Sequence, residues 1–162
     1  MNMPIDVNAA PADAARRVVD AASYLTIATA DAAGTPWATP VWFAEHELRE
    51  YYWVSRPETR HSRNIAERSE VALAVFDSTV AVGSAIAVYV EGTAGEVPAA
   101  ELEAAIAVYD AKSTGLGLRR WTAADVTGEA PFRLFRAKAS QVYVLDERER
   151  RVPVLSSRGS DT

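Results

Sequence analysis

Basic side chains gather within a short stretch of an otherwise acidic chain: Arg56, Arg60, His61 and Arg63. They follow an aromatic run typical of a strand, at the point where a turn opens a short helix. Free backbone N–H groups and the helix dipole favour an anion at such a helix start, and an arginine can hold a phosphate through two hydrogen bonds. The cluster therefore indicates a phosphate seat. The alternative is a solvated helix face paired with neighbouring glutamates.

Helix-capping residues stand beside this cluster. Ser55 can cap a helix start, with Glu58 as its capping-box partner. Thr59 is an equally good cap one step later. Either choice leaves outward-pointing N–H groups beside the arginines.

Side chains that do acid–base or nucleophilic chemistry are scarce. The chain has no cysteine, and its only histidines are His46 and His61. The histidines and carboxylates lack metal-ligand spacings, and no nucleophile-elbow, P-loop or dinucleotide-binding motif is present. We therefore predict no catalytic side chain and no metal site. These features fit a protein whose bound cofactor carries the chemistry.

Composition narrows the class of protein further. The chain has 162 residues, 49% hydrophobic and 24% charged, with a formal charge of -5. This length predicts one domain with an ordinary core, and the acidic balance argues against a nucleic-acid partner. No signal peptide is expected at the N-terminus, and no apolar run is long enough to span a membrane. We expect a soluble, cytoplasmic protein with no membrane partner.

The elements that must position the basic cluster read as short strands and three helices. A helix begins at Pro11, with Ala15, Val18, Val19 and Ala22 on one face. The expected strands are Tyr24–Ala30, Trp37–Glu45, Arg49–Ser55, Val71–Asp77, Ile86–Val97 and Leu134–Leu145. The other helices are 57–68 and one after Pro98, with Leu102, Ile106 and Tyr109 on one face, followed by an irregular segment, 113–131. We predict a mainly β fold with peripheral helices, a small barrel spanning 1–147, and a polar, mobile tail at 148–162.

Pro40 interrupts the second expected strand. A proline cannot donate to a strand ladder, so the position predicts an edge strand or a bulge. A break in pairing would also free backbone N–H and C=O groups that a planar heterocycle could bind.

Three segments in this order, YLTIATADAAGTPWATPVWF, YYWVSRPETRHSRNI and VALAVFD, resemble the pyridoxamine 5'-phosphate oxidase-like superfamily of flavin and deazaflavin oxidoreductases. The resemblance covers roughly residues 12–147. It implies a six-stranded antiparallel split β-barrel of the FMN-binding type and a homodimer with FMN at the subunit interface.

The resemblance also implies roles for particular residues. Thr39, Pro40, Val41 and Trp42 would lie along the isoalloxazine ring, and Val54 and Ser55 would meet the ribityl and phosphate region. Arg60 and His61 would hold the phosphate. His61 stands where lysine is common in the family, which makes phosphate affinity more sensitive to pH, and Arg63 would compensate.

Departures from the family pattern restrict the activity. The vitamin B6 oxidase itself carries a C-terminal Arg-Leu-His-x-Arg-type motif, which this chain lacks, so oxidation of pyridoxamine phosphate is not expected. We expect an FMN-dependent oxidoreductase that passes hydride from a nicotinamide or similar donor to a small acceptor. The alternatives are an F420-dependent reductase and a non-catalytic carrier or sensor of flavin or haem. A haem would need His46 or His61 as its axial ligand.

Overall fold

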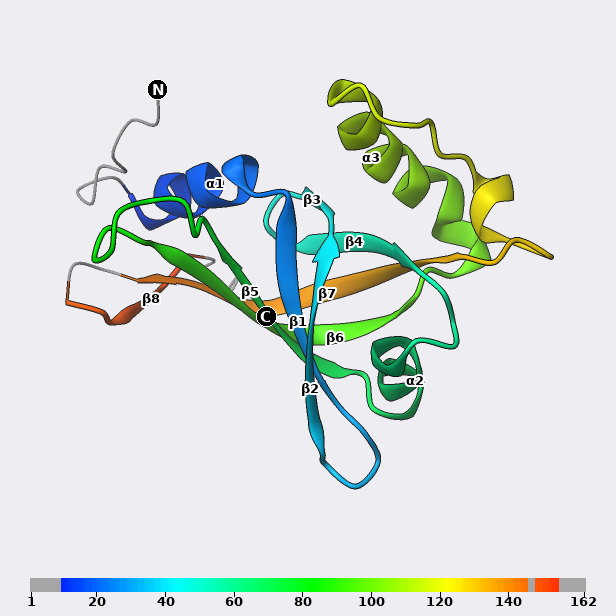
Figure 1. Ribbon diagram of the computed structural model, residues 1–162, viewed down its shortest axis with the longest axis horizontal. Helices are drawn as coiled ribbons and strands as arrows, with labels where there is room; N and C mark the ends of the chain where they lie inside the picture. Colours follow the sequence, from blue (N-terminus) through cyan, green and yellow to red (C-terminus); the bar gives the residue numbers. More distant parts are fainter. Residues whose placement is uncertain (1–9, 146–147, 155–162) are drawn as a thin grey trace, which may run out of the picture.

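The computed structural model describes residues 10–145 and 148–154. Within them, eight strands form one antiparallel sheet: β1 (Tyr24–Ala30), β2 (Pro36–Trp42), β3 (Ala44–His46), β4 (Glu50–Ser55), β5 (Glu70–Phe76), β6 (Ala87–Glu96), β7 (Arg133–Leu145) and β8 (Arg151–Pro153). The α-helices are α1 (Pro11–Ala21), α2 (Arg60–Glu67) and α3 (Leu102–Gly115). The strand order is β2-β1-β5-β6-β7-β4-β3, with β8 added to β7 (Figure 1).

The two ends of this sheet meet at Phe43. β2 and β3 are the outermost strands in the order, and Phe43 is the one residue between them. Its side chain is fully buried, and β2 also contacts β4. The sheet is therefore a curled half-barrel, consistent with the expected split barrel, and the main chain crosses its seam.

The strand count differs from the six that were expected. The expected strand Trp37–Glu45 is two strands, because the chain exchanges one partner, β1, for another, β4, at Phe43. The segment expected as a mobile tail contains β8, in which Val152 lies opposite Val144 of β7. Val154 packs against the core, which explains why this polar segment is held. Residues 155–162, and the N-terminal residues on which the leader prediction depends, lie outside the described residues.

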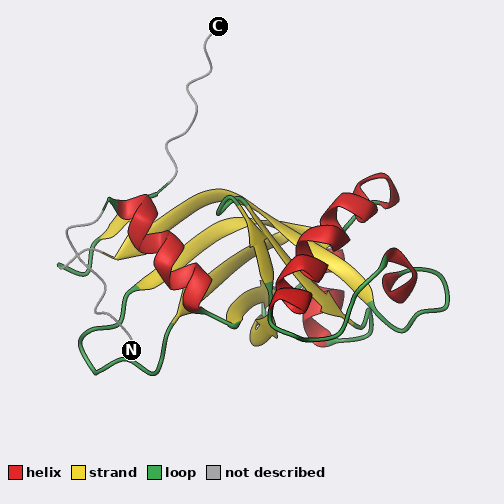
Figure 2. Cartoon of the chain, turned by 90° about the horizontal axis from the view of Figure 1, so that it is seen from above, coloured by secondary structure: helices red, strands yellow, loops and turns green. Residues whose placement is uncertain are grey.

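Two apolar clusters cover the two faces of the sheet. The inner cluster joins α1 to β5, β6 and β7, and the predicted α1 residues Ala15, Val18, Val19 and Ala22 are all buried in it. The outer cluster joins α3 to β3 and β4, through Leu102, Ile106 and Tyr109 as predicted. Figure 2 shows α1 and α3 over opposite ends of the sheet.

The third helix runs further than expected. α3 continues to Gly115, into the segment expected to be irregular from residue 113. Ser113 is buried and donates a hydrogen bond to the carbonyl of Arg119 at 2.6 Å, which ties the helix end to the following loop. No helix in the described part of the chain is long and apolar enough to cross a membrane.

A bulge bends the longest strand pair. The β6–β7 register shifts between Glu91 and Gly92, and Ser140 is the extra residue on β7. A Cβ atom on Gly92 would lie 2.2 Å from the carbonyl oxygen of Lys138, so this position requires glycine.

Candidate functional site

The start of α2 has no side-chain cap. The helix begins at Arg60 rather than at 57, with Thr59 in the N-cap position. The Thr59 hydroxyl lies 3.0 Å from the carbonyl oxygen of Arg56, to which it can donate, and Ser55 contacts His61 instead of capping. The first N–H groups of α2 are therefore not bound by a capping side chain, which leaves donors for an anion.

The arginines around this helix start, Arg56, Arg60 and Arg63, are exposed and form no salt bridge in the described part of the chain. The pKa of Asp31 is lowered mainly by a hydrogen bond from the backbone N–H of Thr35, and the charge of Arg60 contributes to lowering it. Glu67, a candidate partner, instead accepts a hydrogen bond from the backbone N–H of Ala32. These arginines are solvated, as the alternative expected, but in the described structure they form no salt bridge with the neighbouring glutamates.

Two of these arginines lie on aromatic rings. The Arg60 guanidinium carbon is 4.4 Å from the centre of the Trp37 ring, and that of Arg56 is 4.9 Å from the centre of the Phe132 ring. The first contact brings the basic cluster against β2. Arg63, at the same end of α2, has no such contact in the described structure.

His61 is buried beneath the arginines. Its side chain is 7% exposed, and its Nε2 atom lies 2.8 Å from the Ser55 hydroxyl and 3.2 Å from the Thr59 hydroxyl. Burial lowers the pKa of His61 below its ordinary value, which favours a neutral imidazole at pH 7. In this arrangement His61 joins the end of β4 to α2, and the positive charge comes from the arginines.

The strand expected to lie along a ring is an edge strand. Among the described strands β2 pairs only with β1, so Pro40 leaves no gap in a central ladder. Side chains alternate along it: Thr39 and Val41 point into the barrel, and Pro40 and Trp42 point outward. The Trp42 ring meets Tyr109 of α3 edge-on, 4.9 Å between centres. A ring on the outer face would therefore touch the side chains of Pro40 and Trp42, and the other two residues through their main chain.

Val54 and Ser55, at the end of β4, also have side chains in different surroundings. Val54 is half-buried and packs in the outer cluster, whereas Ser55 is buried and bound to His61. Ser55, Arg60 and His61 thus come together at one place. Thr39–Trp42 extend from there along β2, beyond Trp37.

Small side chains on the outer sheet face were missed by sequence reasoning. Ala28 of β1 lies opposite Ala38 of β2, and Ala72 of β5 lies opposite Ala28. All three are exposed, because the buried residues of these strands point the other way. The alternation of alanine with larger residues in YLTIATA and VALAVF was the available signal. A planar group can lie flat against such a face.

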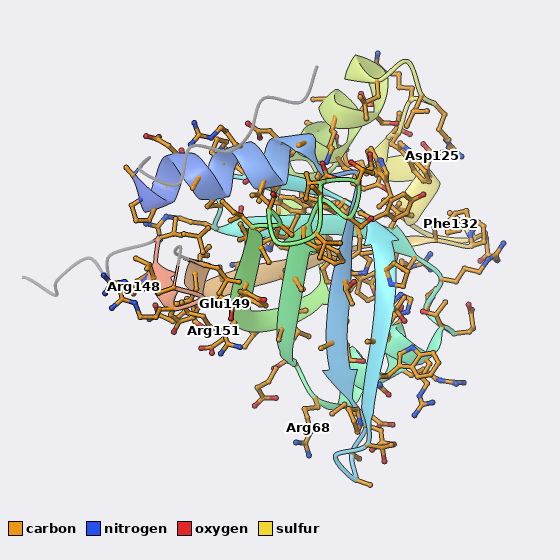
Figure 3. All side chains as sticks on the ribbon, turned by 60° about the vertical axis from the view of Figure 1, so that its left-hand side comes forward. Arg68, Asp125, Phe132, Arg148, Glu149 and Arg151 are labelled. Atoms are coloured by element: carbon orange, nitrogen blue, oxygen red, sulfur yellow. The ribbon has the colours of Figure 1, made fainter. Side chains whose placement is uncertain are left out.

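Charged side chains in the loop after α3 pair with one another. Arg119 pairs with Asp125 at 2.6 Å and stacks on the Trp121 ring, whose centre is 4.0 Å away. Figure 3 labels Asp125 in this loop and Phe132 just after it, both at the same side of the view. In the described residues no group of three or more His, Asp or Glu side chains could hold a metal ion.

Comparison with known proteins places this architecture in a family. The family model described as pyridoxamine 5'-phosphate oxidase matches residues 11–146. The chain therefore belongs to this family, as the resemblance predicted. No curated protein sequence matched it.

Solved structures show the same fold at low sequence identity. A haem-binding protein from Mycobacterium smegmatis matches with a TM-score of 0.64 and 21% identity, over 85% of this chain and 55% of that one. HutZ, a haem storage protein from Vibrio cholerae, matches at 0.62 and 23%, over 80% and 90% of the two chains. An FAD-binding protein from Mesorhizobium loti matches at 0.57 and 21%, over 80% and 89%. This chain spans little more than half of the M. smegmatis protein.

Proposed function

We propose that the protein is a homodimeric, FMN-dependent oxidoreductase with its cofactor at the subunit interface. The observation that carries this proposal is the uncapped start of α2 beside three exposed arginines that form no salt bridge with a described residue. Such a site favours the binding of a phosphate, because the backbone dipoles and the side-chain charges both attract an anion. FMN, when bound, would supply the hydride chemistry.

The chain's own residues would bind and orient the cofactor. Arg60 and Arg63 would hold the phosphate, while His61, held as a neutral group, would fix Ser55 beside it. Pro40 and Trp42 would meet the ring on the outer face of β2, and Thr39 and Val41 would offer main-chain groups. No side chain is assigned an acid–base role.

The outer face of β5, β1 and β2 supports the dimer. Tyr24 is 60% exposed and Phe76 is 49% exposed, and Ala28, Ala38 and Ala72 continue this face along the strands with small apolar side chains. Of the helices in the described structure, α2 meets β1 and β2 on the inward side, where Asn64 bonds to Thr29, and α3 contacts β3 and β4. The three alanines on the outer face stay exposed. A second copy would bury this surface and could shield a bound ring from water.

The visible spectrum of freshly purified protein tests the cofactor. A flavin spectrum, or its appearance on titration with FMN, is expected. A deazaflavin spectrum would identify F420 instead, and a Soret band would identify haem. Protein that stays colourless and does not bind added FMN would overturn the proposal.

Two further measurements test the activity and the assembly. Anaerobic mixing of the FMN-loaded protein with NADH or NADPH should bleach the flavin absorbance. Absence of bleaching with either donor would favour a carrier or another donor. Light scattering coupled to size exclusion should report twice the chain mass of 17.5 kDa, and a monomer would contradict the interface assignment.

A further inference from the structure

A closed set of contacts joins the basic end of the site to the strand expected to carry the ring. Nδ2 of Asn64 donates to the Thr29 hydroxyl at 2.9 Å, and that hydroxyl donates to the carbonyl of Trp37 at 3.4 Å. The Trp37 ring lies under Arg60, one helical turn before Asn64 on α2. The set of contacts therefore begins and ends on α2.

Burial makes the polar part of this set costly to break. Thr29 and Asn64 are each 4% exposed. Their donors and acceptors match in direction, because the amide N–H meets the hydroxyl oxygen and the single hydroxyl proton remains for the carbonyl. A buried polar group that loses its partner pays its desolvation penalty in full.

The position of Thr29 indicates that this polar set is not simple core packing. The other inward positions of β1, Leu25 and Ile27, are apolar and join the inner cluster. Thr29 continues their row, directly opposite Trp37 in the β1–β2 register. An apolar residue of the same shape would fill this space equally well. What the hydroxyl adds is directional hydrogen bonding.

Other contacts hold the same helix against the same hairpin. Arg68 donates to the carbonyl of Ala32 at 3.3 Å, and Figure 3 shows its side chain beside the β1–β2 turn. The Glu67 carboxylate accepts from the Ala32 N–H at 3.3 Å. These residues are exposed, so solvent competes with their bonds. Of the hydrogen bonds described here between α2 and the hairpin, the Asn64–Thr29 bond is buried, and the Thr29–Trp37 bond that continues it is partly buried.

We propose that Thr29 and Asn64 are positioning residues that hold β2 in register with α2, so that the phosphate seat and the ring-bearing strand engage one ligand together. This inference rests on the proposed function. A ligand that spans two elements gains affinity when their spacing is set before it binds. Loss of the connection should therefore reduce the affinity that the phosphate adds, while the ligand's contacts with β2 stay unchanged.

The test compares the affinities of FMN and riboflavin, which differ by the phosphate. Thr29→Val removes the hydroxyl at constant shape, and Asn64→Leu removes the amide. Each should lower the ratio of FMN affinity to riboflavin affinity by about fivefold, the effect of one net hydrogen bond. Thr29→Ser keeps the hydroxyl and should keep the wild-type ratio.

Tyr51→Phe is the matched control. It removes a buried hydroxyl that donates to the carbonyl of Leu48 at 3.3 Å, inside the same barrel but outside the connection. It should lower thermal stability without changing the ratio. An unchanged ratio in both Thr29→Val and Asn64→Leu, or an equal fall in Tyr51→Phe, would overturn the positioning role.

Hydrogen exchange supplies a readout that needs no cofactor. The backbone amides of β2 should exchange faster in Thr29→Val than in wild type, and not faster in Tyr51→Phe. Equal exchange in all three would overturn the claim that Thr29 holds β2. If wild-type protein binds neither flavin, the proposed function fails and the cofactor part of this inference fails with it. The exchange data still decide whether β2 is held.

Discussion

The hydroxyl oxygen of Ser55, at the end of β4, lies 2.8 Å from Nε2 of His61 in the first turn of α2. This contact joins a strand end to a helix start across the turn that carries Arg56. It also explains why neither residue behaves as its position in the sequence suggests. Ser55 does not cap the helix, and His61 does not face solvent.

Stability should therefore depend on pH through His61. Burial lowers its pKa in the folded state, while the unfolded chain titrates near the ordinary value of 6.5. Below that value the unfolded state binds the proton more readily, so the free energy of unfolding falls as the pH drops through 6.5 towards the folded pKa. Above 6.5 both states are neutral, and His61 adds no pH dependence.

Urea unfolding at a series of pH values from about 8 to about 5 measures this effect. His61→Gln removes the titrating group and should flatten the curve in that window. An unchanged slope in His61→Gln would show that another group titrates there.

Arg60→Ala should weaken FMN binding by about 1.5–3 kcal/mol, the usual scale for a hydrogen bond to a charged group. Riboflavin binding should hardly change, because riboflavin has no phosphate. Fluorescence titration of both ligands provides the measurement, with Arg49→Ala, an exposed arginine in the turn before β4, as the matched control. If FMN affinity is unaffected by Arg60→Ala, the phosphate binds elsewhere.

Gly92→Ala should destabilise the fold by about 2–3 kcal/mol, the scale of overpacking against a rigid neighbour. The new methyl group would meet the backbone carbonyl of Lys138, which the β6–β7 ladder holds in place. Chemical denaturation measures the difference. Gly95→Ala, on the same strand with open space around its Cβ position, is the comparison and should be close to neutral. Equal effects at the two positions would contradict the close approach.

Glu47→Asn should stabilise the protein by up to about 1 kcal/mol, because asparagine tolerates the left-handed region better than glutamate does. Glu47 and Leu48 have φ angles of 53° and 58° in the tight turn between β3 and β4. Glu47→Ala keeps the strained backbone and should bring no such gain. A thermal melt of the three proteins distinguishes these outcomes.

Much of the fold could be predicted because periodicity reports burial directly. The spacing of Val18 and Val19 predicted the buried face of α1, and the strand expected at Tyr24–Ala30 is β1 with the same bounds. These signals are local, and the structure agrees with them.

The rest depends on contacts between distant segments. Ser55 and Thr59 were equally good caps by sequence, and the choice depends on where His61 packs. β8 is a strand because Val152 pairs with Val144 of β7. The arginines around Val152 make this segment look polar in the sequence, so the pairing was not predicted. The Thr29–Asn64 bond joins residues far apart in the chain, and neither residue type predicts the other.

The strand order also constrains when the protein can complete its fold during synthesis. β7, residues 133–145, is the last long strand made, and it is the strand that pairs with both β4 and β6. Until it leaves the ribosome, the group β2-β1-β5-β6 and the hairpin β3-β4 share no ladder and are connected through Phe43 and the α2 segment. A nascent chain stalled before residue 133 therefore presents unpaired edges on β4 and β6, the kind of surface that chaperones shield.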